Sequence, residues 1–166
     1  TIVFHDDSFL ALRYEELEEF CKLWKKEIKI PFMVGGVIPN YVREDKIALL
    51  VDAGMNRVRM GIQSGSQNIL DFYKRPTKLH RINNATTIFN NYKKYMLPPN
   101  YDIILENPVE KPEDTKATLD MLYEMPRPYT LNIYALRVIP NTVMEKDIKE
   151  LGIEIPPIDK NYFIDY

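Results

Sequence analysis

The chain has 166 residues, of which 45% are apolar and 28% are charged, a composition that indicates one folded domain and excludes a disordered or collagen-like chain. Its 22 basic and 24 acidic residues give a net charge of −2, so it lacks the basic excess that drives binding to a nucleic-acid backbone. No apolar run approaches the roughly 18 residues that cross a membrane, and residues 1–7 show no signal-peptide pattern. We therefore expect a cytoplasmic protein with no membrane partner, and its charge does not favour a nucleic-acid partner.

The cysteine and histidine content limits metal chemistry. Cys21 is the only cysteine, which excludes an internal disulfide and a multi-cysteine metal site made by this chain alone. It falls at helical spacing beside Phe20 and Trp24, so we interpret it as a small core residue and not as a nucleophile. Neither His5 nor His80 lies in a cluster with ligand spacing. The sequence predicts no metal ligands in this chain.

Short β-branched and aromatic runs alternate with amphipathic segments along the chain. Ser66 and Thr142 are favoured capping residues at the start of two such segments, and Gly54 closes another. The pattern predicts strands over residues 2–4, 32–34, 57–62, 101–105 and 129–138, and helices over residues 13–28, 45–53, 66–72, 79–95, 112–124 and 142–152.

Such alternation is typical of a parallel sheet with right-handed crossover connections, so the predicted fold class is α/β with parallel strands. Residues 1–152 are predicted to form one domain, because no repeat, low-complexity tract or linker divides them. Residues 153–166, which contain Pro156-Pro157, are predicted to be a C-terminal extension. The start at Thr1, directly in an apolar run and without a methionine, indicates a piece of a longer protein.

Ligands of parallel α/β folds gather where the strands end, at their C-terminal edge. The residues expected at that edge are His5, Asp6, Asp7 and Ser8; Gly35, Gly36 and Asn40; Gln63, Ser64 and Gly65; Glu106, Asn107 and Glu110; and Arg137. A structural interpretation stays open at this point. Asp6 and Asp7 can cap the following helix, and residues 63–66 can be a turn followed by a helix cap.

Four segments, taken in order, match the loops of a known family. They are Phe4-His5-Asp6-Asp7-Ser8-Phe9; Ala53-Gly54 before Val58-Arg59-Met60-Gly61-Ile62-Gln63-Ser64-Gly65-Ser66; Tyr101-Asp102-Ile103-Ile104-Leu105 with Pro108, Glu110 and Asp114; and Ile139-Pro140-Asn141-Thr142. The chain resembles the radical S-adenosylmethionine (radical SAM) superfamily, especially its cobalamin-associated and methylthiotransferase-like branches. The corresponding family loops read Asp-Asp-x-Phe, Gly-Ile-Glu-Ser-Gly-Ser, Asp-x-Ile-x-Gly-x-Pro-x-Glu-Thr-x-x-Asp and Pro-Gly-Thr. The resemblance implies a parallel-stranded, partial TIM-like barrel.

The family's CxxxCxxC loop, which holds a [4Fe-4S] cluster, is absent from this chain. In the family that loop follows the first strand, so the chain resembles strands two to six of a (β/α)6 barrel. The smaller departures from the family pattern are Gln63 for Glu, Glu106 and Val109 for Gly, Lys111 for Thr, and Asn141 for Gly. The resemblance implies that the cluster ligands lie outside the chain, on a missing N-terminal segment of its parent.

By resemblance, the parent enzyme reduces SAM with the cluster and releases a 5′-deoxyadenosyl radical that abstracts hydrogen from a substrate. Neither the substrate nor a catalytic residue can be named from the sequence. The resemblance places Asp6 and Asp7 at the methionine end of SAM, and Gln63 and Ser64 at its ribose or carboxylate. It places Arg75 at the methionine carboxylate. The implied adenine side consists of Asp102, Glu106 and the backbone around Val138. A cobalamin held by another domain is compatible with the branch.

Two other functions stay open. One is a barrel enzyme without SAM that binds a phosphorylated metabolite at a helix N-terminus near Gly65-Ser66, although no glycine-rich phosphate loop with a lysine supports it. The other is a non-catalytic structural or docking fragment whose loops are vestigial. With the first strand absent, residues 2–4 are a bare sheet edge, so we also expect self-association through that edge.

Overall fold

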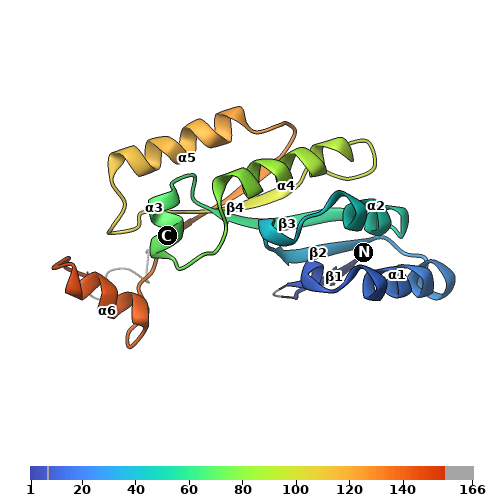
Figure 1. The fold of residues 1–166 in the computed structure, drawn as a ribbon, viewed down its shortest axis with the longest axis horizontal. Helices are drawn as coiled ribbons and strands as arrows, with labels where there is room; N and C mark the ends of the chain where they lie inside the picture. Colours follow the sequence, from blue (N-terminus) through green and yellow to red (C-terminus); the bar gives the residue numbers. More distant parts are fainter. Residues whose placement is uncertain (7, 156–166) are drawn as a thin grey trace, which may run out of the picture.

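The computed structural model describes residues 1–6 and 8–155, which form one parallel five-stranded sheet with helices packed on it (Figure 1). The strands are β1 (Ile2–Phe4), β2 (Phe32–Val37), β3 (Met55–Gln63), β4 (Asn100–Leu105) and β5 (Thr130–Ala135). The α-helices are α1 (Tyr14–Leu23), α2 (Glu44–Asp52), α3 (Gln67–Phe72), α4 (Leu79–Asn91), α5 (Pro112–Glu124) and α6 (Val143–Glu150). The strands lie in chain order, and every neighbouring pair is parallel. The predicted α/β class with parallel strands is therefore confirmed.

Local chemistry sets two of the helix boundaries. The helix predicted over residues 13–28 is divided, because its last turn widens into the π-helix Trp24–Ile28 and ends at Lys29, whose φ is 60°. The predicted cap of α6 is confirmed, since the Thr142 hydroxyl accepts a hydrogen bond from the backbone N of Glu145 at 3.3 Å.

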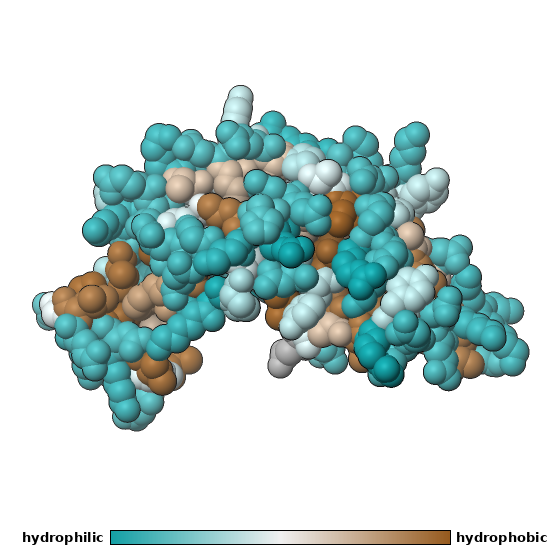
Figure 2. Space-filling view, viewed as in Figure 1, coloured by the Kyte–Doolittle hydropathy of each residue, from teal (hydrophilic) through white to brown (hydrophobic). Residues whose placement is uncertain are grey.

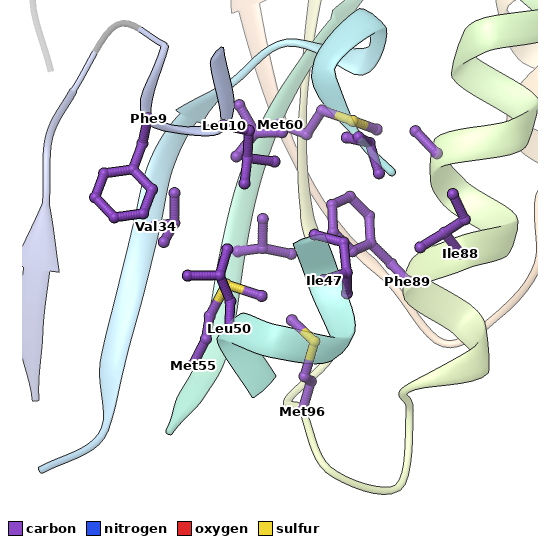
Figure 3. Close-up of a cluster of buried hydrophobic side chains, with 14 of the residues drawn as sticks. Phe9, Leu10, Val34, Ile47, Leu50, Met55, Met60, Ile88, Phe89 and Met96 are labelled. Atoms are coloured by element: carbon purple, nitrogen blue, oxygen red, sulfur yellow. The ribbon is translucent and has the colours of Figure 1, made fainter. Parts of the chain in front are cut away.

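The hydrophobic core lies between the sheet and the helices that cover one of its faces. Apolar side chains from α1, α2, α4 and the strands form one cluster, in which Ile47 and Leu50 are fully buried (Figure 3). Burying each such side chain contributes roughly 1.5–3 kcal/mol. The rings of Phe4, Phe20, Trp24 and Phe32 pack together near β1, with centroids 5.1 to 5.8 Å apart. Cys21 is fully buried, which confirms its predicted core role.

The opposite face of the sheet is polar. Successive side chains of a strand point to opposite faces, so Arg59, Gly61 and Gln63 of β3 share the face turned away from the core. The strand register places Asp102 of β4 beside Gly61, and Asn132 of β5 beside Asp102. Polar groups from three neighbouring strands therefore lie together and lead toward the C-terminal edge of the sheet.

The helix α6 lies at one end of the molecule, beside α3 (Figure 1). Its Ile148 is fully buried, and its Asp147 forms an ion pair of 2.8 Å with Lys74, just after α3. Exposed apolar side chains gather over this end, among them Val143 and Leu151 (Figure 2). Most of the predicted extension, from residue 156 onward, lies outside the described residues, so the division at residues 152 and 153 stays a prediction.

Candidate cofactor-binding site

A pocket of about 310 Å³ opens at the C-terminal ends of β2 and β3, beside the middle of β4. It is lined by Gly36, Val37, Ile38, Gly61, Gln63, Arg75 and Asp102. Three of these residues, namely Gln63, Arg75 and Asp102, are among those assigned to SAM by resemblance. The fold thus brings together side chains from β3, β4 and the segment after α3.

The amide of Gln63 occupies a position that depends on Gly61. Gln63 is the last residue of β3, and its φ of 72° turns the chain sharply at the pocket. Its side chain folds back over the strand, so that a Cβ at Gly61 would stand only 2.5 Å from the Gln63 Nε2. An alanine at position 61 would therefore displace the amide from the pocket.

The carboxylate of Asp102 is held by two residues that the sequence reasoning did not name. The Nε of Arg59 lies 2.9 Å from each oxygen of Asp102, and the Nδ2 of Asn132 donates to Oδ1 at 2.9 Å. The side chain of Asp102 is 16% exposed, so it is largely shielded from water and yet reaches the pocket. The alternation Arg59-x-Gly61-x-Gln63 within β3 was the available signal that Arg59 shares a face with the pocket.

Arg75 brings a positive charge to the pocket. It follows α3, and its backbone N donates to the carbonyl oxygen of Leu70 at 2.9 Å, which fixes the start of its side chain. Within residues 1–6 and 8–155, no carboxylate forms a salt bridge with its guanidinium. This cation is available for an anionic group of a ligand.

Ser64 does not reach the pocket. It is fully buried, its hydroxyl lies 3.2 Å from the Thr118 Oγ1 on α5, and it accepts a hydrogen bond from the backbone N of Ser66 at 3.0 Å. The backbone N of Gly65 donates to the same Thr118 Oγ1 at 2.9 Å. The turn after β3 therefore joins the sheet to α5, in agreement with the structural interpretation that the sequence left open.

Ser66 also differs from its predicted role. It stands at the N-cap position of α3, but its hydroxyl makes no capping bond and instead donates to Asp114 Oδ1 at 2.5 Å. Asp114 Oδ2 accepts from the backbone N of Lys111 at 3.1 Å. The Ser66 hydrogen bond and the Lys111 backbone together hold the pKa of Asp114 below its ordinary value. The prediction that Ser66 caps α3 through its side chain is wrong, because α5 supplies a charged acceptor.

Among the described residues, Asp6, Glu106 and Val138 were also assigned by resemblance, and they do not line this pocket. The Asp6 side chain is exposed and its Oδ1 accepts from the backbone N of Ser8 at 2.8 Å, as in a tight turn, while Asp7 lies outside the described residues. Glu106 is exposed just after β4, with a φ of 56°. Val138 is half-buried beyond the end of β5.

The described part of the chain holds no group of three or more His, Cys, Asp or Glu side chains arranged to bind a metal ion. Cys21 is fully buried, and burial raises the pKa of its thiol to about 11, as expected of a structural cysteine. A [4Fe-4S] cluster needs several thiolates, so the residues of this chain do not fit that group.

Residues 1–122 match the family model of the Radical SAM superfamily. The chain belongs to the radical SAM superfamily. The match includes every residue that lines the pocket, so the predicted family is confirmed for the part of the chain that forms the site.

A curated relative supports this membership over part of its own length. The tRNA uridine(34) acetyltransferase of Dehalococcoides mccartyi (strain CBDB1) is 28% identical over 114 residues, which are 68% of this radical SAM chain and 24% of that protein. The chain thus spans about a quarter of the length of this relative.

Solved radical SAM enzymes share the fold. Coproporphyrinogen III oxidase (HemN) from Escherichia coli has a TM-score of 0.71 and 19% identity, covering 90% of this chain and 35% of that one. The methyltransferase TsrM from Kitasatospora setae has a TM-score of 0.65 and 18% identity, and the match covers 86% of this chain and 28% of that one. The cobalamin-dependent enzyme OxsB has a TM-score of 0.64 and 19% identity, and the match covers 96% of this chain and 23% of that one. At these identities the likeness is one of fold, and it confirms the predicted partial TIM-like barrel.

None of the helices within the described residues is long and apolar enough to span a bilayer.

Proposed function

We propose that the pocket binds SAM in an enzyme that cleaves SAM reductively, with a [4Fe-4S] cluster held by residues other than these 166. The observation that carries the proposal is the meeting of Gln63, Arg75 and Asp102, from three separate segments, in one pocket. Membership of the radical SAM superfamily supports SAM and the cluster as cofactors. SAM, when bound, supplies the radical chemistry of the family, and the residues of this chain bind and orient it.

The chemistry of the pocket suits the parts of SAM. The guanidinium of Arg75, which pairs with no carboxylate among the described residues, matches the methionine carboxylate, since an arginine can bind a carboxylate through two parallel hydrogen bonds. The amide of Gln63 both donates and accepts, as a ribose hydroxyl requires. The Asp102 carboxylate accepts hydrogen bonds and suits the hydroxyl or amino groups of the nucleoside end. Gly36, which also lines the pocket, leaves room for the ligand to approach the backbone, whereas Gly61 leaves room for the Gln63 amide.

The remaining residues assigned by resemblance have unequal support. Asp6 and Asp7, in the loop after β1, stay assigned to the methionine end, where a carboxylate suits an ammonium group. Glu106 and Val138 stay assigned to the adenine side. We assign the Ser64 hydroxyl to the fold, because Thr118 and Ser66 already engage it. A cobalamin bound by another domain, a cytoplasmic location and a barrel domain over residues 1–152 also remain proposals.

Binding measurements on the full-length protein test this function. In equilibrium dialysis with labelled SAM, Gln63→Ala should weaken binding by roughly 2- to 12-fold, the effect of one neutral hydrogen bond. Arg75→Met should weaken it more, because a charge-assisted bond is lost. Arg81→Met, which removes an exposed cation on α4, is the matched control and should leave SAM affinity unchanged. If the pocket variants melt at lower temperature but bind SAM like the parent, the pocket residues serve the fold and the proposal is wrong.

Of the two alternatives, the phosphate-binding enzyme has lost its support. The backbone N of Gly65 already donates to Thr118, and that of Ser66 donates to Ser64, so neither is free to bind a phosphate. A non-catalytic role is favoured by one observation, namely that the single cysteine is buried. A full-length protein that binds no SAM would support that second candidate.

A further inference from the structure

The polar face of the sheet carries a hydrogen-bonded network that begins outside the pocket and ends within it. Arg59 of β3 lies in register with Asn100 of β4, two residues before the pair formed by Gly61 and Asp102. On β5, Asn132 lies beside Asp102, and Tyr134 lies beside Ile104. Asp102 is therefore flanked by Arg59 on one strand and by Asn132 on the other.

The guanidinium of Arg59 is fixed at both ends. Its Nε lies 2.9 Å from both oxygens of Asp102, and its Nη2 donates to the Tyr134 hydroxyl at 2.6 Å. The guanidinium carbon also lies 5.9 Å from the centre of the Tyr134 ring, within the range of a cation–π contact. Arg59 thus bridges β3, β4 and β5, and its side chain is only 35% exposed.

Asn132 fixes the carboxylate from the other side. Its Nδ2 donates to Asp102 Oδ1 at 2.9 Å and to Asn100 Oδ1 at 2.5 Å, and the Nδ2 of Asn100 donates in turn to the Thr130 Oγ1 at 3.0 Å. A carboxylate offers about four acceptor positions. Arg59 and Asn132 together make three hydrogen bonds to the Asp102 carboxylate, so one acceptor position remains for a ligand in the pocket.

We propose that Arg59 is a positioning residue, which together with Tyr134 and Asn132 aims the Asp102 carboxylate at the nucleoside end of a ligand in the pocket. This inference rests on the proposed SAM function and adds the residues that prepare Asp102 for it. Without Arg59, the Asp102 side chain loses the partner that binds both of its oxygens and is free to adopt other rotamers. Arg59 itself does not line the pocket, so its effect on a ligand passes through Asp102.

The SAM affinity of the full-length protein tests the proposal, and thermal melting shows whether each variant is still folded. Arg59→Met should weaken SAM binding by roughly 10-fold or more, the loss expected when hydrogen bonds to a charged group are removed. Arg59→Lys should weaken SAM binding less than Arg59→Met does, because lysine keeps the positive charge but lacks the planar guanidinium group. Arg57→Met is the matched control, since Arg57 lies on the same face of β3, is exposed, and lies two residues farther from the pocket.

A double variant separates positioning from a general loss of stability. In an Asp102→Asn background, Arg59→Met should weaken SAM binding little further, because its effect passes through Asp102. Tyr134→Phe, a milder change, should weaken binding by a few-fold or less. The inference is overturned if Arg59→Met binds SAM like Arg57→Met while Gln63→Ala and Arg75→Met bind it weakly; the proposed function then still stands. It is overturned as well if the Arg59 and Asp102 effects simply add. If no pocket variant changes SAM affinity, the proposed function fails and the inference fails with it.

Discussion

Gly65 lies directly against the backbone of α5, where a Cβ built on it would stand 2.6 Å from the Cα of Thr118. The backbone N of Gly65 also donates to the Thr118 hydroxyl at 2.9 Å. The absence of a side chain at Gly65 therefore permits the approach of α5 to the end of β3, and the hydrogen bond fixes it. Since β3 ends at Gln63, this contact also supports the wall of the pocket.

Gly65→Ala should lower the free energy of unfolding by about 1–3 kcal/mol, because backbone and not a flexible side chain opposes the added methyl group. Urea unfolding followed by Trp24 fluorescence measures the change. Gly152→Ala serves as a comparison, since no atom lies within 4 Å of the added Cβ, and its φ of 70° makes backbone strain the expected cost at that position alone. A Gly65→Ala variant as stable as the parent would show that α5 accommodates the added methyl group and would contradict close contact as the reason for glycine at this position.

Glu106 holds a backbone conformation that favours glycine, with a φ of 56°. A left-handed conformation costs an L-residue about 1–2 kcal/mol, while glycine loses about 0.5–1 kcal/mol more chain entropy on folding. Glu106→Gly should therefore raise the free energy of unfolding by up to about 1 kcal/mol in chemical denaturation. Glu106→Ala removes the same side chain without relieving the backbone and should give no gain. Should both variants stabilise the protein equally, the cause is the carboxylate and not the φ angle.

The sequence predicted the local features of the fold well. Its periodicities depend on neighbouring residues, so the strands, the helices and the parallel class followed from it. Glu106 and Asn141, which differ from glycines of the family pattern, both take positive φ values of 56° and 65°. Both positions therefore take a backbone conformation that glycine adopts more readily than other residues.

The contacts between distant segments could not be predicted from the sequence. Arg59 and Asp102 are 43 residues apart, and Ser66 and Asp114 are 48 apart. Their pairing depends on the register of β3 with β4 and on the approach of α5, neither of which appears in a local pattern. From the local sequence, an arginine within a strand is explained as a surface residue, and a serine before a helix is explained as a cap. Neither explanation identifies the actual partner, which is Asp102 for Arg59 and Asp114 for Ser66.

The Ser66 and Asp114 pair predicts a specific pH dependence. The hydrogen bond from Ser66 lowers the pKa of Asp114. A carboxyl group whose pKa is lower in the folded state contributes stability above its unfolded pKa, near 3.9, and loses this contribution as the pH falls through the folded value. Ser66→Ala should therefore reduce the free energy of unfolding at pH 7 by about 1.5–3 kcal/mol, and by less at an acid pH low enough to protonate Asp114 in the folded protein.

Chemical denaturation at the two pH values measures this difference. Ser8→Ala is the control, because the Ser8 hydroxyl makes no capping bond in the short helix that it precedes. It should change stability little at either pH. A loss for Ser66→Ala that is the same at both pH values would assign the hydroxyl a packing role and contradict the charge-assisted bond.

The burial of Cys21, the single cysteine of the chain, leads to a prediction for cluster reconstitution. Anaerobic treatment of this chain with iron and sulfide should yield no [4Fe-4S] cluster, because several thiolates are needed and its one thiol is fully buried. Iron analysis and visible absorbance measure the result, with Cys21→Ser as the background. About four irons per chain, lost in Cys21→Ser, would contradict both the burial argument and the assignment of the cluster to other residues.

The strand β1 is an edge of the sheet, with β2 as its one hydrogen-bonded neighbour among the described strands. Ile2 and Val3 are 38% and 42% exposed there. The free N–H and C=O groups of such an edge can pair with a strand of another chain. We therefore expect this chain to associate as its concentration rises, which sedimentation velocity can measure over a wide range of concentrations.

Val3→Lys should weaken this association, because a charged side chain on an edge strand opposes the approach of a second apolar edge. Leu119→Lys is the matched control, since Leu119 is 58% exposed on α5 and lies on no strand. If the association is driven by exposed apolar surface in general, both substitutions will weaken it equally. A chain that remains monomeric at every concentration would show that the β1 edge does not pair in this way, and that the exposure of Ile2 and Val3 has no consequence for assembly.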